Sequence, residues 1–173
     1  SNIISVSGSI DANEQVEIRS EVSGIVEGIY FQEGSFVSKG QLLFKVNDIE
    51  LRAQLRQTST KEGLAAENER RAKLLLQKEA ISQEEYDLAR ADFKSAQAQS
   101  QLIQAQIAKT SIRAPFSGKI GLRSISSGTY LTPAILVTKL VNTTKVKITF
   151  SIPEKYANQV KSNTTIRFKV AGS

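Results

Sequence analysis

The sequence contains one internal repeat, and this repeat constrains the possible fold more than any other feature. Residues 18–46 align without a gap on residues 112–140. Both copies consist of short apolar runs separated by glycines, a pattern that predicts short strands and turns. Neither copy has enough apolar surface to fold alone, so we expect the two to pack as one small β-domain with pseudo-twofold symmetry.

Four glycines occupy matching places in the two copies. Gly24 aligns with Gly118, and Gly34 aligns with Gly128. Because glycine adopts a positive φ that other residues avoid, we interpret all four as structural turns of the β-domain. A valine at position 24 or 118 is then expected to disturb the domain.

The segment between the two copies has a different composition. Residues 48–112 contain no proline and a single glycine, and they are rich in Ala, Gln, Leu, Glu, Arg and Lys. This composition favours helix. We predict two antiparallel helices over residues 48–110, forming a hairpin roughly 40 Å long.

Apolar residues recur at spacings of three and four in the second part of this segment, which predicts a helix face packed against a partner helix. The predicted seam positions are Tyr86, Ala89, Phe93, Ala96, Ser100, Ile103 and Ile107. The first part is less regular, and its expected inward positions are Leu51, Leu55, Ala65, Ala72, Leu75 and Leu76.

The connection between the helices carries a capping signal. Ser82 followed by Glu85 fits a capping box, and Ile81 with Tyr86 fits the accompanying hydrophobic staple. We therefore expect the second helix to begin at Gln83, with Ser82 and Glu85 as the hairpin cap.

The two ends of the chain predict a further β-domain. Residues 144–152 alternate between apolar and polar, with Val146, Ile148, Phe150 and Ile152 on one face. Pro153 opens a predicted short helix over residues 154–160, and a second alternating strand follows over residues 166–170. Ile4, Val6 and Ile10 supply a third strand. Such a set has open edges and is typical of part of a barrel whose other strands lie beyond Ser173.

The expected architecture is therefore an elongated α+β mosaic of three parts. Residues 1–13 and 142–173 form part of a β-barrel domain, residues 14–47 and 111–141 form the repeated β-domain, and residues 48–110 form the helical hairpin.

Composition excludes several kinds of function. The chain has no Cys and no His, which excludes a thiolate nucleophile, a Ser-His-Asp triad and the usual tetrahedral zinc site. It also has no Met, so the thioether ligands that soft metals such as copper prefer are absent from the sequence. For the same reason, we do not expect Ser1 to be a translation start. We expect no catalysis, no cofactor and no metal, in a chain that is processed or truncated.

The formal net charge of +6 raises the possibility of nucleic-acid binding. Residues 48–110 carry ten basic and ten acidic side chains, so the hairpin is neutral overall. The excess lies from Lys139 onward, where lysines alternate with apolar residues. This pattern favours a solvated sheet face over a nucleic-acid patch.

Several short motifs of this chain resemble the motifs of one known protein family, and they follow one another in the same order. The matching motifs are a β-domain half-motif in residues 22–26 and 33–43, a second half-motif in residues 112–121, a hairpin tip in residues 81–87 and the start of a barrel domain in residues 150–154. Arg71, Leu75 and Ser82 match the spacing of the family's hairpin tip. The chain is similar to the periplasmic adaptor subunits, or HlyD-like membrane fusion proteins, of tripartite efflux pumps with resistance-nodulation-division (RND) transporters.

The resemblance implies a fold and a function. It implies a split lipoyl/biotinyl-like β-domain, an antiparallel coiled-coil hairpin and part of a β-barrel. It also implies a non-enzymatic periplasmic adaptor, attached to the inner membrane through an N-terminal anchor that lies outside this chain. Its partners would be an inner-membrane RND transporter, an outer-membrane TolC-like channel and further copies in a ring, a hexamer or a trimer of dimers.

By the same resemblance, Arg71, Leu75 and Ser82 would dock the hairpin tip on the channel. Arg71 and Leu75 are four residues apart and so share one helix face. In the alternative, purely structural interpretation, Arg71 is a solvated cation, Leu75 is a seam residue and Ser82 is a helix cap.

Two other functions remain as alternatives. A lipoyl or biotin carrier needs a lysine on the turn after the first half-motif, but Asn47, Asp48 and Ile49 follow Val46 there. A coiled-coil arm that binds nucleic acid needs net positive charge, which residues 48–110 lack.

Overall fold

The computed structural model describes residues 3–153, and for residues 11–12 and 143–147 it describes the backbone alone. The chain divides into two compact units, a main unit over Gln15–Asn142 and a terminal unit made from the chain on either side of it. The predicted helix over residues 154–160 and strand over residues 166–170 lie outside the described residues.

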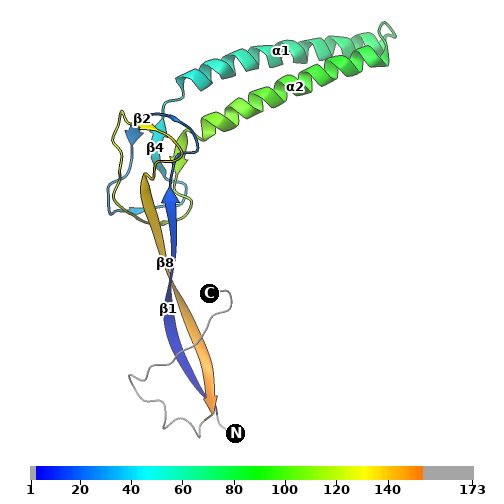
Figure 1. The fold of residues 1–173 in the computed structure, drawn as a ribbon. Coiled ribbons are helices and arrows are strands. Elements are labelled where there is room, and N and C mark those ends of the chain that lie inside the picture. Colours follow the sequence, from blue (N-terminus) through cyan, green and yellow to red (C-terminus); the bar gives the residue numbers. More distant parts are fainter. Residues whose placement is uncertain (1–2, 154–173) are drawn as a thin grey trace. The chain divides into compact units, whose positions relative to one another are not determined.

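The fold is mixed α+β, with a helical hairpin inserted between strands of the main unit (Figure 1). The elements in chain order are β1 (Ile3–Ile18), β2 (Gly24–Ile29), β3 (Phe36–Val37), β4 (Leu42–Val46), α1 (Ile49–Gln77), α2 (Gln83–Ala108), β5 (Ser111–Arg113), β6 (Gly118–Ile120), β7 (Tyr130–Leu131) and β8 (Thr138–Pro153).

The described strands form two four-stranded sheets with the orders β1-β8-β6-β3 and β5-β4-β2-β7. Each strand of the first sheet has an equivalent strand in the other copy of the repeat. Substituting these equivalents into the strand order of the first sheet gives the strand order of the second. The register obeys the same rule, because Val26 pairs with Val46 just as Ile120 pairs with Leu140. This relation confirms the predicted pseudo-twofold symmetry.

Each sheet takes strands from both copies of the repeat. β3 pairs with β6, and β2 pairs with β7, so every sheet needs both halves of the chain. Equivalent apolar positions meet in one core, which explains why neither copy could bury its apolar face alone. The buried apolar residues are Ile18, Val26, Val37, Leu43, Phe44, Val46, Ala114, Ile120, Ile125, Leu131, Val137 and Leu140.

The strands β1 and β8 continue from the main unit into the terminal unit. In the latter part of β8, Ile148, Phe150 and Ile152 are half-buried while Thr149 and Ser151 are exposed, as the alternation predicts. The side chain of Val146 lies outside the described residues. Ile4, Val6 and Ile10 lie in β1 as predicted; Val6 and Ile10 are half-buried, and Ile4 is exposed.

Helices α1 and α2 lie side by side along their length (Figure 1). All seven predicted seam positions of α2 are half-buried or buried. On α1, eight half-buried positions follow the same alternation of three and four residues: Leu51, Leu55, Thr58, Glu62, Ala65, Glu69, Ala72 and Leu76. Ala66 and Glu67 are half-buried as well.

Two aspects of the α1 prediction are wrong. Leu75 is exposed, because it is one residue, or about 100° of helix rotation, away from the seam position Leu76. Thr58, Glu62 and Glu69 take seam positions that apolar periodicity alone does not reveal.

Among the described helices, none is both long and apolar enough to cross a bilayer.

Candidate functional site: the hairpin tip and the hairpin base

Arg71 and Leu75 are exposed together near the end of α1. The Arg71 side chain is 64% exposed, and its Nε lies 3.3 Å from Oε1 of Glu67. Leu75 is 43% exposed. The two residues therefore present one cation and one apolar side chain at the distal end of the hairpin.

Ser82 lies across the connection from these residues and starts the second helix. Its Oγ accepts a 3.1 Å hydrogen bond from the backbone N–H of Glu85, and α2 begins at Gln83, where the sequence predicts its start. The cap satisfies an N–H that the helix itself leaves unpaired. Glu84 and Glu85 add negative charge to the first turn, which favours the helix N-terminus.

The end of α1 is closed by a second capping device. Glu79 has a φ of 56°, in the left-handed region that usually takes glycine. The N–H of Glu79 donates to the carbonyl of Leu76 at 2.9 Å, and the N–H of Ala80 donates to the carbonyl of Leu75 at 2.8 Å. This is a Schellman motif, so both helix ends at the tip are hydrogen-bonded.

One hydrogen bond joins the two helices close to the tip. Tyr86 Oη donates to Oε1 of Glu69 at 2.7 Å, from a seam position on each helix. The bond to Glu69 raises the pKa of the Tyr86 phenol, because the carboxylate favours the protonated hydroxyl. Glu69 is thus a polar seam residue with a specific partner.

An ion cluster on α1 lies next to the tip residues. Arg70 makes two bonds to Glu67, at 2.6 and 3.0 Å, and these bonds lower the pKa of Glu67 to about 2. Arg71 adds a smaller contribution. Because all three side chains are largely exposed, the cluster organises the surface more than it stabilises the fold.

The four glycines of the repeat are required for two different structural reasons. Gly34 and Gly128 have φ values of 76° and 93°, so they form the matching turns that the sequence predicts. Gly118 is not a turn residue: it begins β6, and a Cβ there would lie 2.3 Å from the carbonyl oxygen of Val141. Gly24 likewise begins β2, where a Cβ would lie 2.7 Å from Cγ1 of Val46.

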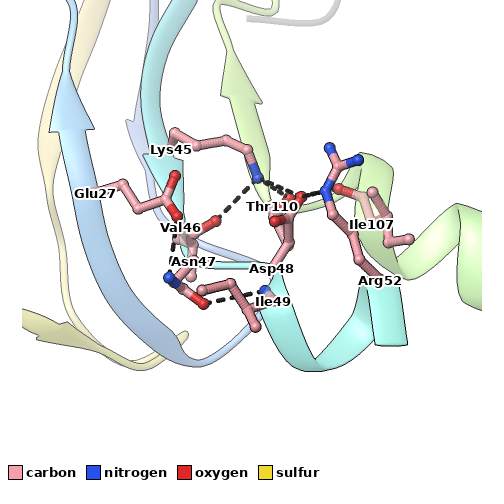
Figure 2. Close-up of polar contacts among 9 residues, drawn as sticks. All are labelled: Glu27, Lys45, Val46, Asn47, Asp48, Ile49, Arg52, Ile107 and Thr110. Atoms are coloured by element: carbon pink, nitrogen blue, oxygen red, sulfur yellow. Dashed lines mark hydrogen bonds and ion pairs between the residues drawn. The ribbon is translucent and has the colours of Figure 1, made fainter. Parts of the chain in front are cut away.

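At the base of the hairpin, three side chains form a buried polar contact that we name the base clamp: Lys45, Asp48 and Thr110 (Figure 2). Lys45 is on β4, Asp48 immediately precedes α1, and Thr110 follows α2. The Lys45 ammonium donates to Thr110 Oγ1 at 2.5 Å, to Asp48 Oδ2 at 3.1 Å and to the Val46 carbonyl at 3.0 Å. Its three N–H donors therefore have three acceptors.

Further bonds extend this contact. Thr110 Oγ1 donates to the Ile107 carbonyl at 2.5 Å, and Arg52 Nε donates to Asp48 Oδ2 at 2.9 Å. Burial alone would raise the pKa of the Asp48 carboxyl, but its bonds to Lys45 and Arg52 outweigh burial and hold the pKa below its usual value. The base clamp is therefore charged.

The sequence assigns no role to Lys45, and this contact was not predicted from it. A lysine within the apolar run 42–46, three residues before an aspartate, was the available signal. Thr110 could not be paired with it, because 65 residues separate the two. The Lys45 side chain is only 17% exposed and lies within a strand, which argues against a carrier lysine presented on a turn.

A cleft of about 810 Å³ lies between the hairpin base and the β-domain. Glu50, Gln54 and Gln106 line it from the helices, and Val22, Ile25 and Tyr130 line it from the β-domain. Among the described residues, acidic side chains do not gather into a group of three or more that could hold a metal ion.

Comparison with known proteins places the chain in a family. The sequence model described as "RND MFP, barrel-sandwich hybrid domain" matches residues 14–143. The chain therefore belongs to the membrane fusion proteins of the RND type, and the resemblance drawn from its motifs is confirmed at this level.

Two curated relatives illustrate the likeness. The solvent efflux pump periplasmic linker SrpA of Pseudomonas putida is 34% identical over 125 residues, which are 72% of this chain and 33% of SrpA. The multidrug resistance protein MdtA of Yersinia enterocolitica is 31% identical over an alignment 186 positions long, which covers 92% of this chain and 41% of MdtA. The chain thus spans less than half the length of either relative.

Solved structures show a similar fold. A putative efflux transporter from Bacteroides eggerthii matches with a TM-score of 0.70 and 26% identity, over 82% of this chain and 46% of that one. A MacA-MexA chimeric protein that contains the Pseudomonas aeruginosa MexA α-hairpin domain matches with a TM-score of 0.71 and 21% identity, over 79% and 53%.

Proposed function

We propose that this chain is part of a non-enzymatic periplasmic adaptor that links an inner-membrane RND transporter to an outer-membrane TolC-like channel. Membership of the family and the likeness to relatives such as SrpA, a periplasmic linker of a solvent efflux pump, support this role. The observation that carries the docking part is the joint exposure of Arg71 and Leu75 beside a doubly capped turn.

The chemistry of the tip suits a helical partner. The Arg71 guanidinium offers a planar set of donors to carbonyl or carboxylate oxygens at the ends of a partner's helices. Leu75, one turn further along the same face, adds an apolar contact. Because the connection is capped on both sides by Ser82 and Glu79, little backbone entropy is lost when the tip binds.

The other parts take the roles that the resemblance implies. The β-domain is the lipoyl-like domain, with Gly24, Gly34, Gly118 and Gly128 shaping its two halves, and it packs against other copies in a ring. The hairpins, each a two-stranded coiled coil, form a tube that ends at the channel. The terminal unit belongs to the barrel that holds the transporter, and an N-terminal anchor attaches the adaptor to the inner membrane.

The test is a cross-linked pull-down of the full-length adaptor from native cell envelopes, with partners identified by mass spectrometry. We compare the wild type with Arg71→Asp at the tip and with Arg56→Asp, an exposed arginine nearer the base of the same helix. We expect the channel to be lost only with Arg71→Asp, while the transporter is recovered from all three. Equal loss of the channel with Arg56→Asp would contradict docking at the tip, and recovery of neither partner from the wild type would overturn the adaptor role.

A further inference from the structure

Besides the base clamp, a few hydrogen bonds join the hairpin base to the β-domain: the Val46 N–H donates to the Thr110 carbonyl at 2.8 Å, the Asn47 N–H donates to the Ile25 carbonyl at 2.8 Å, and the Asn47 side chain donates to Glu27 at 3.0 Å. Neither α1 nor α2 packs along a strand of the β-domain within the described residues. On one side the hairpin base borders the cleft of about 810 Å³, so side chains do not fill the space there. The ion pair across this side, between Lys109 and Glu21 at 3.7 Å, is exposed and therefore weak.

The base clamp contacts both ends of the hairpin from one atom. Lys45 Nζ binds Asp48 at the start of α1 and Thr110 at the end of α2, while its own backbone belongs to β4 of the core. Asp48 is 7% exposed and Thr110 is 1% exposed, so water does not compete for these bonds. Three bonds from one largely covered ammonium define a direction as well as a contact.

The repeat provides an internal comparison. Lys139 is the equivalent of Lys45 in the second copy, where β8 continues as a strand to Pro153, the last residue that the structure describes. Lys139 is exposed, whereas Lys45 is covered by the hairpin base. The buried lysine therefore goes with the hairpin and is not a requirement of the β-domain.

We propose that Lys45, together with Asp48 and Thr110, fixes the direction in which the hairpin leaves the β-domain. Buried ion pairs contribute little net stability because desolvation offsets their attraction, but they require specific geometry. The base clamp is thus a positioning device, and without it the hairpin moves into the cleft beside it while both parts remain folded.

The proposal is tested by a distance measurement within the whole 173-residue chain. Because the chain has no Cys, Ser127→Cys on the β-domain and Ala91→Cys on α2 give two unique sites for spin labels, and both are exposed. Pulsed electron paramagnetic resonance then reports the distribution of distances between them. We expect one narrow distribution with the base clamp intact.

Lys45→Met removes the ammonium and keeps an unbranched side chain, and Lys61→Met makes the same change at an exposed position of α1. We expect Lys45→Met to broaden the distance distribution at least twofold, with helical circular dichroism unchanged, and Lys61→Met to leave it narrow. If Lys45→Met reduces the helical signal, the distance distribution is measured in Thr110→Val instead. This variant removes only a hydroxyl, at nearly constant volume, and the same broadening is expected.

A distribution that stays narrow in a folded base-clamp variant overturns the proposal. Broadening by Lys61→Met as well would overturn it too, because the effect would then not belong to the base. The readout is a distance within one chain, so its result is independent of whether the hairpin tip binds a channel.

Discussion

Tyr86 on α2 and Glu69 on α1 meet at 2.7 Å across the hairpin seam, about one turn from the tip. We expect Tyr86→Phe to lower the melting temperature of the helices, because it removes the phenol donor and leaves the half-buried Glu69 carboxylate without it. Circular dichroism at 222 nm measures this. Tyr30→Phe, on an exposed tyrosine of the β-domain, is the matched control and should leave the helical transition unchanged.

The same contact makes a prediction about alkaline pH. The pKa of Tyr86 is raised above its ordinary value of 10.0, so the protonated phenol stabilises the fold. This contribution is complete below pH 10 and is lost as the pH rises through the raised pKa. Ultraviolet titration of the wild type minus Tyr86→Phe should show a tyrosine that ionises above pH 10, and a midpoint at or below 10 would contradict the contact.

Ser100 is a buried hydroxyl in the seam of α2. It is 2% exposed, and its Oγ has no hydrogen-bond partner among the residues that the structure describes. We expect Ser100→Ala to raise the free energy of unfolding by about 1 kcal/mol, because an unpaired buried hydroxyl is removed. Urea denaturation measures the change. Ser95→Ala, at an exposed position of the same helix, gives the part due to helix propensity alone, and an equal gain there would argue against the orphaned hydroxyl.

Glu79 carries the left-handed residue of the Schellman motif without being glycine. Its φ of 56° is strained for a residue with a Cβ, so we expect Glu79→Gly to stabilise the hairpin by about 0.5–1 kcal/mol. Glu79→Ala removes the carboxylate but keeps the strain, and it should bring no gain. The two free energies, measured by urea denaturation, must differ if the turn has this geometry.

Two glycines should respond to alanine in opposite ways. At Gly118 a new Cβ would lie 2.3 Å from the Val141 carbonyl oxygen, and we expect a loss of roughly 1–3 kcal/mol as β6 and β8 separate. At Gly63, within α1, a Cβ meets nothing within 4 Å, and better helix propensity should add about 1 kcal/mol. Thermal unfolding of both variants checks the signs. Equal tolerance at both sites would show that β6 and β8 are not so close.

The ion cluster beside the tip gives an acid-pH prediction. The pKa of Glu67 is lowered to about 2 from 4.5, chiefly by its bonds to Arg70. The stabilisation from this contact is complete above pH 4.5 and is lost as the pH falls toward 2. Carboxyl NMR titration should show the pKa of Glu67 moving back toward 4.5 in Arg70→Met and moving less in Arg71→Met, whose bond is longer. A larger shift in Arg71→Met would contradict this assignment.

Much of the fold follows from local patterns in the sequence. The repeat predicts that equivalent residues of the two copies make equivalent contacts, and the structure agrees, because Val26 pairs with Val46 as Ile120 pairs with Leu140. The spacing of the α2 seam and the start of α2 at Gln83 also follow, since helix periodicity and capping depend on residues within a few positions of one another.

The site is only partly predictable. The shared face of Arg71 and Leu75 follows from their spacing, but the exposure of Leu75 depends on which face of α1 meets α2. Apolar periodicity assigns that face poorly here, because Glu62 and Glu69 occupy seam positions and Leu64 and Leu74 are exposed. The choice of face is made by the partner helix.

The sequence by itself determined the two-copy β-domain, through the internal repeat, and the inserted helices and the capped connection at Ser82, through composition and patterns over a few residues. Only the tertiary structure decided that Gly118 is required by the close approach of Val141, and that Lys45 joins Asp48 to Thr110. These contacts bring together residues that are distant along the chain. Their geometry is set by how strands and helices pack, and local periodicity carries no information about that distance.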